Sequence, residues 1–151
     1  MKKIYILIIS FCFLSLTNDN GNVFNIEFKQ KIILKVTQKS STEFELTEVK
    51  REPFDKIVDV WDNDDALSKS GKKETIEFYF CQAQENGQES TALIMKSRSK
   101  FSLQFDTEIQ KTENAKFEKV PNVGTHTNSK TQESWGYKIN QIRISNFRLK
   151  K

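Results

Sequence analysis

The chain has few of the residues on which most catalytic and metal sites depend. Its 151 residues include one histidine, two cysteines, five glycines and two prolines. The low glycine and proline content excludes collagen-like and low-complexity chains. It also leaves no glycine-rich dinucleotide fingerprint, and Gly71-Lys72-Lys73 lacks the upstream glycine of a phosphate-binding loop. We therefore expect no cofactor.

The single histidine limits nucleophilic catalysis. Any Ser-His-Asp or Cys-His mechanism must use His126, which lies in VGTHTNSKT, a stretch of small polar residues typical of a loop. Cys81 could approach His126 only through the tertiary fold. We interpret His126 as a solvated loop residue. A zinc site needs several His or Cys ligands, so we expect none.

The N-terminus has the pattern of an export signal. Lys2 and Lys3 precede an apolar run of ~13 residues that ends at Leu16, too short for a bilayer span. We predict a signal peptide over residues 1–17, a mature β domain over residues 18–151 without a membrane span, and a secreted or periplasmic location. An uncleaved anchor is one alternative. A lipoprotein modified at Cys12 is another, which the bulky Phe11 disfavours.

The basic character belongs partly to this signal. The formal net charge is +4, and removal of Lys2 and Lys3 would leave +2, so we expect no nucleic-acid partner. The other basic residues form two groups, which we interpret as solubilising exposed turns and strand edges, with acidic glycans or lipid headgroups as alternative partners. The groups are Lys96, Arg98 and Lys100 on a turn, and Arg143, Arg148, Lys150 and Lys151 near the C-terminus.

Apolar residues alternate along most of the chain. Residues 24–36 alternate over one long bent strand or two strands, and residues 101–110 alternate cleanly. Twelve phenylalanines favour a β-rich core. About seven or eight short strands separated by turn residues predict an all-β, antiparallel two-sheet sandwich, with a small β-barrel as the alternative.

Two segments carry more detailed expectations. Asn86-Gly87 predicts a hairpin, whose second strand is apolar on both faces, which indicates a central strand or a shift in register. Cys81 faces away from the core, where we expect a neighbouring element to cover it; an exposed Cys81 could form an intermolecular disulfide. In the final segment, residues 135–149, the alternation slips twice. We predict bulges at Gly136 and at Ser145-Asn146, since a bulge moves the following side chains to the other face.

Acidic residues offer weak candidates for chemistry. A calcium site would be best supplied by the acidic turn Asp59, Asp62, Asp64 and Asp65. Counted from Asp62, the EF-hand positions for an oxygen ligand and a glycine hold Ala66 and Leu67, so we expect a solvated turn and no metal. We also expect Asp64 or Asp65 to cap one helical turn ending at Gly71. Paired carboxylates of a hydrolase would be brought together only by the fold.

The last sixty residues carry a resemblance. TALIMKSRSKFSLQFDTEIQ and the ending ESWGYKINQIRISNFRL resemble a group of small exported β-sandwich-like proteins from Bacteroidetes-type bacteria. The shared pattern is a strand, a polar turn, an alternating strand, Glu-x-Trp and an Ile-rich terminal strand. The resemblance implies export and a β fold, and it transfers no functional residue.

These observations favour a non-catalytic, exported binding or interaction module with an unknown protein or small-molecule partner. The first alternative is a barrel that carries a small apolar ligand, which would require an internal cavity of hundreds of Å³. The second is a carboxylate-dependent hydrolase. We expect no catalytic residue, and the sequence does not identify the ligand-binding residues.

Overall fold

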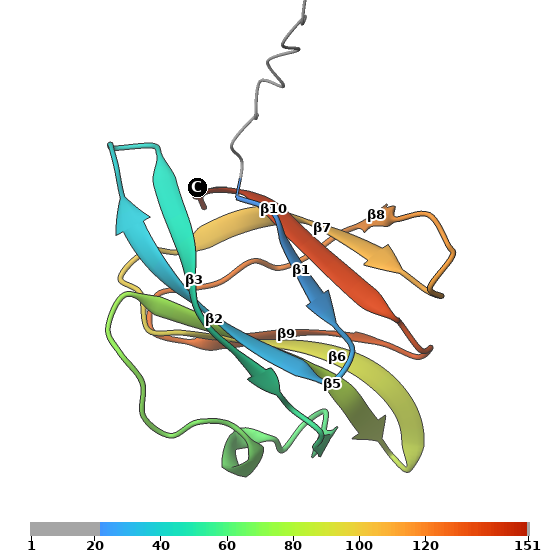
Figure 1. Cartoon of the computed structure of the whole chain (residues 1–151). Coiled ribbons are helices and arrows are strands. Elements are labelled where there is room, and N and C mark those ends of the chain that lie inside the picture. Colours follow the sequence, from blue (N-terminus) through green and yellow to red (C-terminus); the bar gives the residue numbers. More distant parts are fainter. Residues whose placement is uncertain (1–21, 151) are drawn as a thin grey trace, which may run out of the picture.

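The computed structural model describes residues 22–150, which form two facing β-sheets (Figure 1). Sheet A contains, in order across the sheet, β1 (Phe24–Glu27), β10 (Gln141–Leu149), β7 (Leu103–Gln110) and β8 (Glu118–Val120). Sheet B contains β3 (Phe44–Pro53), β2 (Gln30–Gln38), β5 (Thr75–Glu85), β6 (Gln88–Ser97) and β9 (Lys130–Trp135), with β4 (Ile57–Asp59) beside β5. The strands do not close into a single sheet, which confirms the sandwich and not the small barrel.

The described part has ten strands, more than the predicted seven or eight, because two segments divide between the sheets. After β1 the chain turns at Phe28 and Lys29, the latter at φ 66°, and β2 starts in the other sheet. Even-numbered side chains stay inward in both strands. The alternation is also interrupted at Gly136 because the chain passes there from β9 in sheet B toward β10 in sheet A. The predicted bulge at Gly136 is therefore wrong. The predicted bulge near Asn146 is confirmed by a register shift within β10.

The main core lies between the sheets and is filled by alternating side chains from both. The rings of Phe78 on β5 and Phe105 on β7 meet edge to face, with centroids 5.7 Å apart. Both are at most 1% exposed. Burial of apolar area on this scale is the main stabilising term of a domain that lacks disulfides, and Cys81 is the one cysteine in residues 22–150.

A second, smaller core lies on the outer face of sheet B. The segment from Phe54 to Leu67 lies over this face and covers Tyr79, Cys81 and Ile94. Within this segment β4 pairs with β5 in parallel, an exception to the expected antiparallel pattern. The central hairpin β5–β6 is therefore buried on both faces, as its sequence predicts.

The helical turn in this cover differs from expectation. It is a single 3₁₀ turn, Asp64–Ala66, and its preceding residue is Asn63. The prediction that Asp64 or Asp65 caps it is wrong, and the turn ends at Leu67, well before Gly71. Leu67 leaves the turn because its side chain joins the second core.

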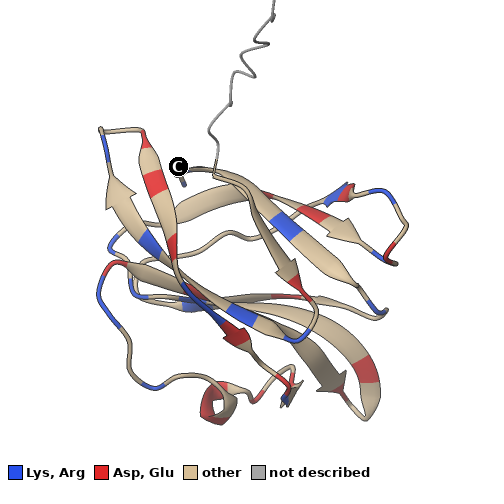
Figure 2. Ribbon diagram, viewed as in Figure 1, with Lys and Arg blue, Asp and Glu red and all other residues tan. Residues whose placement is uncertain are grey.

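Charged residues of both signs occur on both sheets (Figure 2). On sheet A, Arg143 lies 3.7 Å from the centre of the Phe117 ring and 3.5 Å from a carboxylate oxygen of Glu108. No helix within residues 22–150 has the length and apolarity needed to cross a membrane. The predicted signal peptide, residues 1–17, lies outside the described residues.

Two glycines provide a matched test of the backbone. Gly124 has φ 68°, and a Cβ there would lie 2.5 Å from the Leu103 carbonyl oxygen, whereas a Cβ at Gly136 would meet nothing within 4 Å. We expect Gly124→Ala to lower the free energy of unfolding by at least about 1–2 kcal/mol. Gly136→Ala should change it by less than about 0.5 kcal/mol. Equal urea midpoints for the two variants would contradict this assignment.

Candidate functional site

The inner face of the β5–β6 hairpin changes character before the hairpin ends. Cross-strand pairs near the core are apolar and buried, and those toward the tip are polar. From core to tip, the inner-face pairs are Phe78 with Met95, Phe80 with Leu93, Gln82 with Thr91, and Gln84 with Glu89. The hairpin therefore extends beyond the apolar core and presents a polar floor at the end of the sandwich.

The β1–β2 turn forms one wall of this end. The Phe28 ring meets Phe80 edge to face at 5.7 Å, which closes the core at that point. Lys29 adopts positive φ, and its carbonyl oxygen accepts a hydrogen bond of 2.7 Å from the Phe54 amide. Its ammonium group pairs with Asp55 at 2.7 Å. The turn is thus fixed to the main core through Phe28 and to the start of the cover segment through Lys29.

The connection from β9 to β10 forms the opposite wall. The Thr91 hydroxyl, on the hairpin floor, donates a 2.9 Å hydrogen bond to the Tyr137 carbonyl oxygen. Two residues later Ile139 is fully buried in the main core. This connection is consequently fixed to both the floor and the core.

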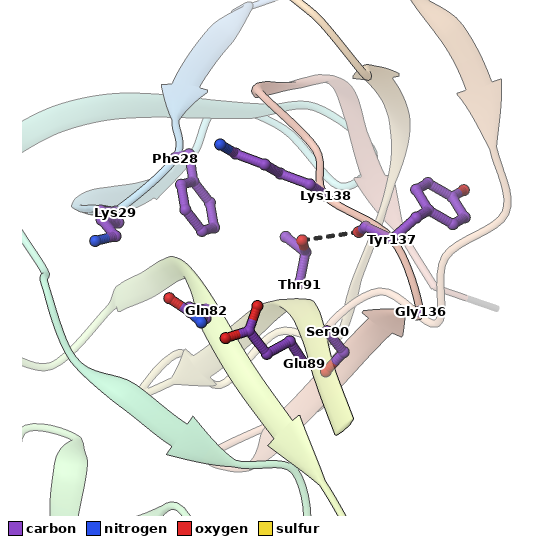
Figure 3. A pocket seen from close by; sticks show the side chains of 9 residues that line it. All are labelled: Phe28, Lys29, Gln82, Glu89, Ser90, Thr91, Gly136, Tyr137 and Lys138. Carbon is purple, nitrogen blue, oxygen red and sulfur yellow. Dashed lines mark hydrogen bonds between the residues drawn. The ribbon is translucent and has the colours of Figure 1, made fainter. Parts of the chain in front are cut away.

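Between these walls lies a hollow of about 480 Å³, which we call the end groove. Figure 3 shows the Phe28 ring, Gln82 and Glu89 directed into it, whereas the Tyr137 ring points away. The Lys138 side chain extends across it toward Phe28. The lining residues are Phe28, Lys29, Gln82, Glu89, Ser90, Thr91, Gly136, Tyr137 and Lys138.

Several polar groups of the end groove lack a protein partner. Within residues 22–150, no hydrogen bond or ion pair joins the side chains of Gln82, Glu89 or Lys138 to another residue. The Ser90 hydroxyl oxygen is also unpaired among the described residues, but it is buried on the outer face of the hairpin, on the side of Ala83 and Ala92, and does not belong to the groove floor. The unpaired side chains of Gln82, Glu89 and Lys138 are therefore the groups of the groove that an external partner could bind.

A second group of polar side chains lies on the outer face of sheet B, around Ser68, directly after the cover segment. Lys31 is 5% exposed and Glu77 is 2% exposed, and their charged atoms lie 3.3 Å apart. The Tyr79 hydroxyl donates to Glu77, and the Lys31 ammonium donates to the Ser68 hydroxyl at 2.7 Å. Arg98 adds a 3.0 Å hydrogen bond to the Ser68 carbonyl oxygen. We call these five residues the buried charge network.

The network fixes the cover and leaves little for a ligand. A hollow of about 340 Å³ adjoins it, but the charged groups of Lys31 and Glu77 already bind one another or neighbouring residues. Gly71 lets the backbone pass closely, since a Cβ there would lie 2.2 Å from Nε of Arg98. A buried pair with satisfied partners is a structural arrangement, so the end groove is the stronger candidate site.

The acidic turn does not gather around a common point. Asp59 accepts hydrogen bonds from the amides of Trp61 and Asp62, at 2.7 and 2.9 Å. Asp64 pairs with Lys130 at 2.6 Å, and Asp65 pairs with Lys69 at 3.1 Å. Across residues 22–150 no three His, Cys, Asp or Glu side chains are placed to hold one metal ion.

His126 and Cys81 lie in different surroundings. The His126 ring nitrogen Nε2 is 2.9 Å from the Lys150 ammonium, on the surface. Cys81 is fully buried in the second core, where burial raises the pKa of its thiol to about 12. The predicted cover over Cys81 is confirmed.

Two of the three basic residues predicted on a turn are less exposed than the sequence suggests, whereas Lys100 is exposed. Lys96 and Arg98 both donate to the Ser68 carbonyl oxygen, so their interpretation as solvated turn charges is wrong. They are drawn inward because they flank the buried Glu77. Near the C-terminus, Arg148 pairs with Asp106 at 3.2 Å, and Lys150 donates to the Val123 carbonyl oxygen at 2.8 Å. Lys151 lies outside the described residues.

The sequence contains one signal for the end groove that is not among the predictions made from it above. In TIEFYFCQAQ the inward positions Phe78 and Phe80 are followed at the same spacing by Gln82 and Gln84. Strict alternation with a switch from phenylalanine to glutamine shows that the strand outlasts the core. Gly136 and Lys138 carry no comparable signal. They lie in the connection between β9 and β10, and its position depends on how the chain passes from sheet B to sheet A.

Burial of Cys81 predicts an unreactive thiol. A thiol reacts as the thiolate, and a pKa of about 12 leaves almost none at pH 8. We expect an aromatic disulfide reagent to modify Cys81 only when the protein is unfolded in guanidinium chloride. Rapid stoichiometric modification of the native protein would contradict the burial.

The buried charge network should be costly to interrupt. Glu77→Gln keeps the shape of the side chain but leaves Lys31 with the partly exposed Glu52, at 3.4 Å, as its counterion, so we expect a loss of about 3 kcal/mol in the free energy of unfolding. The control is Glu45→Gln, which removes the exposed Lys39–Glu45 pair and should cost less than about 1 kcal/mol. Urea unfolding measures both.

The same variant tests the pH dependence. Burial lowers the Lys31 pKa, but Tyr79 and Glu77 outweigh burial and raise it above its ordinary value. Burial, followed by the hydrogen bond to Glu77, raises the Tyr79 pKa. Both groups therefore stabilise the fold fully below their ordinary pKa values and lose this effect as pH rises through the folded-state values. Stability should fall above about pH 10, and less steeply in Glu77→Gln.

Comparison with known proteins does not identify the site. No protein-family model, curated protein or solved structure matches the chain. The resemblance of its last sixty residues to small exported proteins therefore stays a prediction. The geometry of the end groove is the basis on which a function can be proposed for this chain.

Proposed function

We propose that the protein is an exported, non-catalytic β-sandwich binding module and that the end groove holds its ligand. The observation that carries this proposal is the polar floor of the β5–β6 hairpin. Gln82 and Glu89 are directed into a hollow of about 480 Å³, and no described residue bonds their side chains. A volume of this size is typical of small-ligand sites.

The positions of the reactive residues support binding without catalysis. Neither His126 nor Cys81 lines the end groove, so a Ser-His or Cys-His mechanism has no place there. A carboxylate-dependent hydrolase needs two carboxyl groups across the scissile bond. Among the described residues that line this hollow, Glu89 is the one with a carboxylate.

The carrier alternative fits the structure less well. An apolar ligand held between the sheets would need the space that the aromatic side chains occupy, such as the contact of Phe78 with Phe105. The end groove, in turn, has one phenylalanine ring and mainly hydrogen-bonding side chains. Such a lining favours a hydrophilic ligand.

Backbone amide NMR spectra can test the site directly. Glucose, glycylglycine, inorganic phosphate and benzyl alcohol would be added separately to the isotope-labelled protein. For at least one probe, we expect concentration-dependent shifts that cluster at Gln82, Ser90 and Gly136. Gly136→Leu should abolish them, because its side chain enters open space in the groove, whereas Glu43→Gln on the distant β2–β3 turn should not.

Two results would contradict the proposal. One is an absence of shifts at the groove for all four probes. The other is a cluster of shifts beside Lys31 and Gly71, which would make the hollow next to the buried charge network the binding site. A well-dispersed spectrum of Gly136→Leu is needed to show that the variant is folded.

A further inference from the structure

We infer that the ligand of the end groove is a neutral glycan chain, an inference that rests on the function proposed above. The site extends beyond the end groove into two neighbouring hollows. The end groove shares Glu89, Ser90 and Gly136 with a hollow of about 250 Å³ at the hairpin tip. On its other side, it shares Phe28 with a hollow of about 590 Å³. The three hollows thus adjoin one another at shared lining residues, an arrangement that suits an extended ligand.

The surface of these three hollows is lined mainly by hydrogen-bonding side chains. Most of its lining side chains are amides or carboxylates. The amides are Gln82, Asn86, Gln88, Gln110, Asn140 and Gln141, and the carboxylates are Glu27, Glu85, Glu89 and Glu113. Amides both donate and accept, and carboxylates accept. A chain of hydroxyl groups, each able to donate and accept, matches such a lining. The Gln110 amide already bonds the Glu113 and Ala115 carbonyl oxygens, so the free groups lie mainly toward the hairpin.

The charged side chains of this surface disfavour an anionic ligand. The residues that line the three hollows include four carboxylates and two ammonium groups, and the ammonium group of Lys29 is already paired with Asp55. This surface is therefore acidic on a protein whose formal net charge is +4. A uronic-acid polymer, a phosphorylated ligand or a nucleic acid would meet repulsion there.

The position of this surface at the ends of strands favours a glycan over a basic peptide. Peptides often bind as an added strand along a free sheet edge, with pockets for alternate side chains. Here the surface crosses strand ends, and β5 beyond Phe80 is already paired with β4 through Gln82. The one aromatic ring directed into the groove is Phe28, which can stack on the C–H face of a sugar.

The test uses hexasaccharides of glucose (α- and β-linked), xylose, mannose and N-acetylglucosamine. Controls are a galacturonate hexasaccharide and a peptide of alternating lysine and serine. Calorimetry and amide NMR would follow binding to the isolated protein and to its Gln82→Ala, Glu89→Gln and Gly136→Leu variants, with Glu43→Gln as the matched control outside the groove.

We expect at least one neutral hexasaccharide to bind with shifts along the three hollows. Gln82→Ala should weaken it about fivefold, the effect of one hydrogen bond, and Gly136→Leu should abolish it. Glu89→Gln keeps a hydrogen-bonding side chain and removes its charge, so it should change glycan affinity less than about threefold. Salt weakens contacts between charged groups by screening them, and a neutral glycan makes no such contact with the protein. Its affinity should therefore be nearly the same between about 50 and about 500 mM salt.

The remaining outcomes overturn the inference in distinguishable ways. Preference for the lysine peptide, with a large loss in Glu89→Gln and at high salt, would identify a basic peptide as the ligand. If small probes bind in the groove but no neutral hexasaccharide does, the glycan is wrong and the binding site stands. If neither binds, both proposals fail. Shortened hexasaccharide products would contradict a non-catalytic role.

Discussion

Burial of the β5–β6 hairpin on both faces is the constraint on which the rest of the structure depends. One face contributes Phe78 and Phe80 to the core between the sheets, and the other places Cys81 and Ile94 under the cover segment. Within sheet B, β2, β4 and β9 pair with this central hairpin directly, and β3 is joined to it through β2. A chain with one buried thiol and no disulfide in its described residues is held together by this double layer of apolar contact.

The polar side chains on the two faces of the hairpin differ in whether they have protein partners. This difference separates the structural side of the hairpin from its candidate binding side. Beside the end of the cover, Lys31 and Glu77 are paired, and their hydrogen bonds are completed by Ser68 and Tyr79. Such satisfied groups fix the cover against sheet B. In the end groove, Gln82 and Glu89 have no partner among the described residues, and a site ready for a ligand is expected to contain such groups. The proposed binding function follows from this contrast.

The end groove combines a fixed shape with a polar lining. The hairpin floor, the β1–β2 turn and the β9–β10 connection come from three separate parts of the sequence, and each is tied to the core or to its neighbour. The groove is therefore formed by rigid elements, which limits the entropy lost on binding. Its amides and carboxylates favour hydroxyl groups and disfavour anions.

The sequence by itself determined the strand periodicity, the sandwich class, the hairpin at Asn86-Gly87 and the inward direction of Phe78, because alternation and turn residues act locally. Even the switch from Phe80 to Gln82 is visible in it. Only the tertiary structure decided that Trp135 and Gln141 belong to different sheets, that Lys96 and Arg98 turn toward Ser68, and that Lys138 extends across the groove toward Phe28. These relations join residues far apart in the chain, and they arise from which apolar surfaces bury one another, which no local pattern specifies.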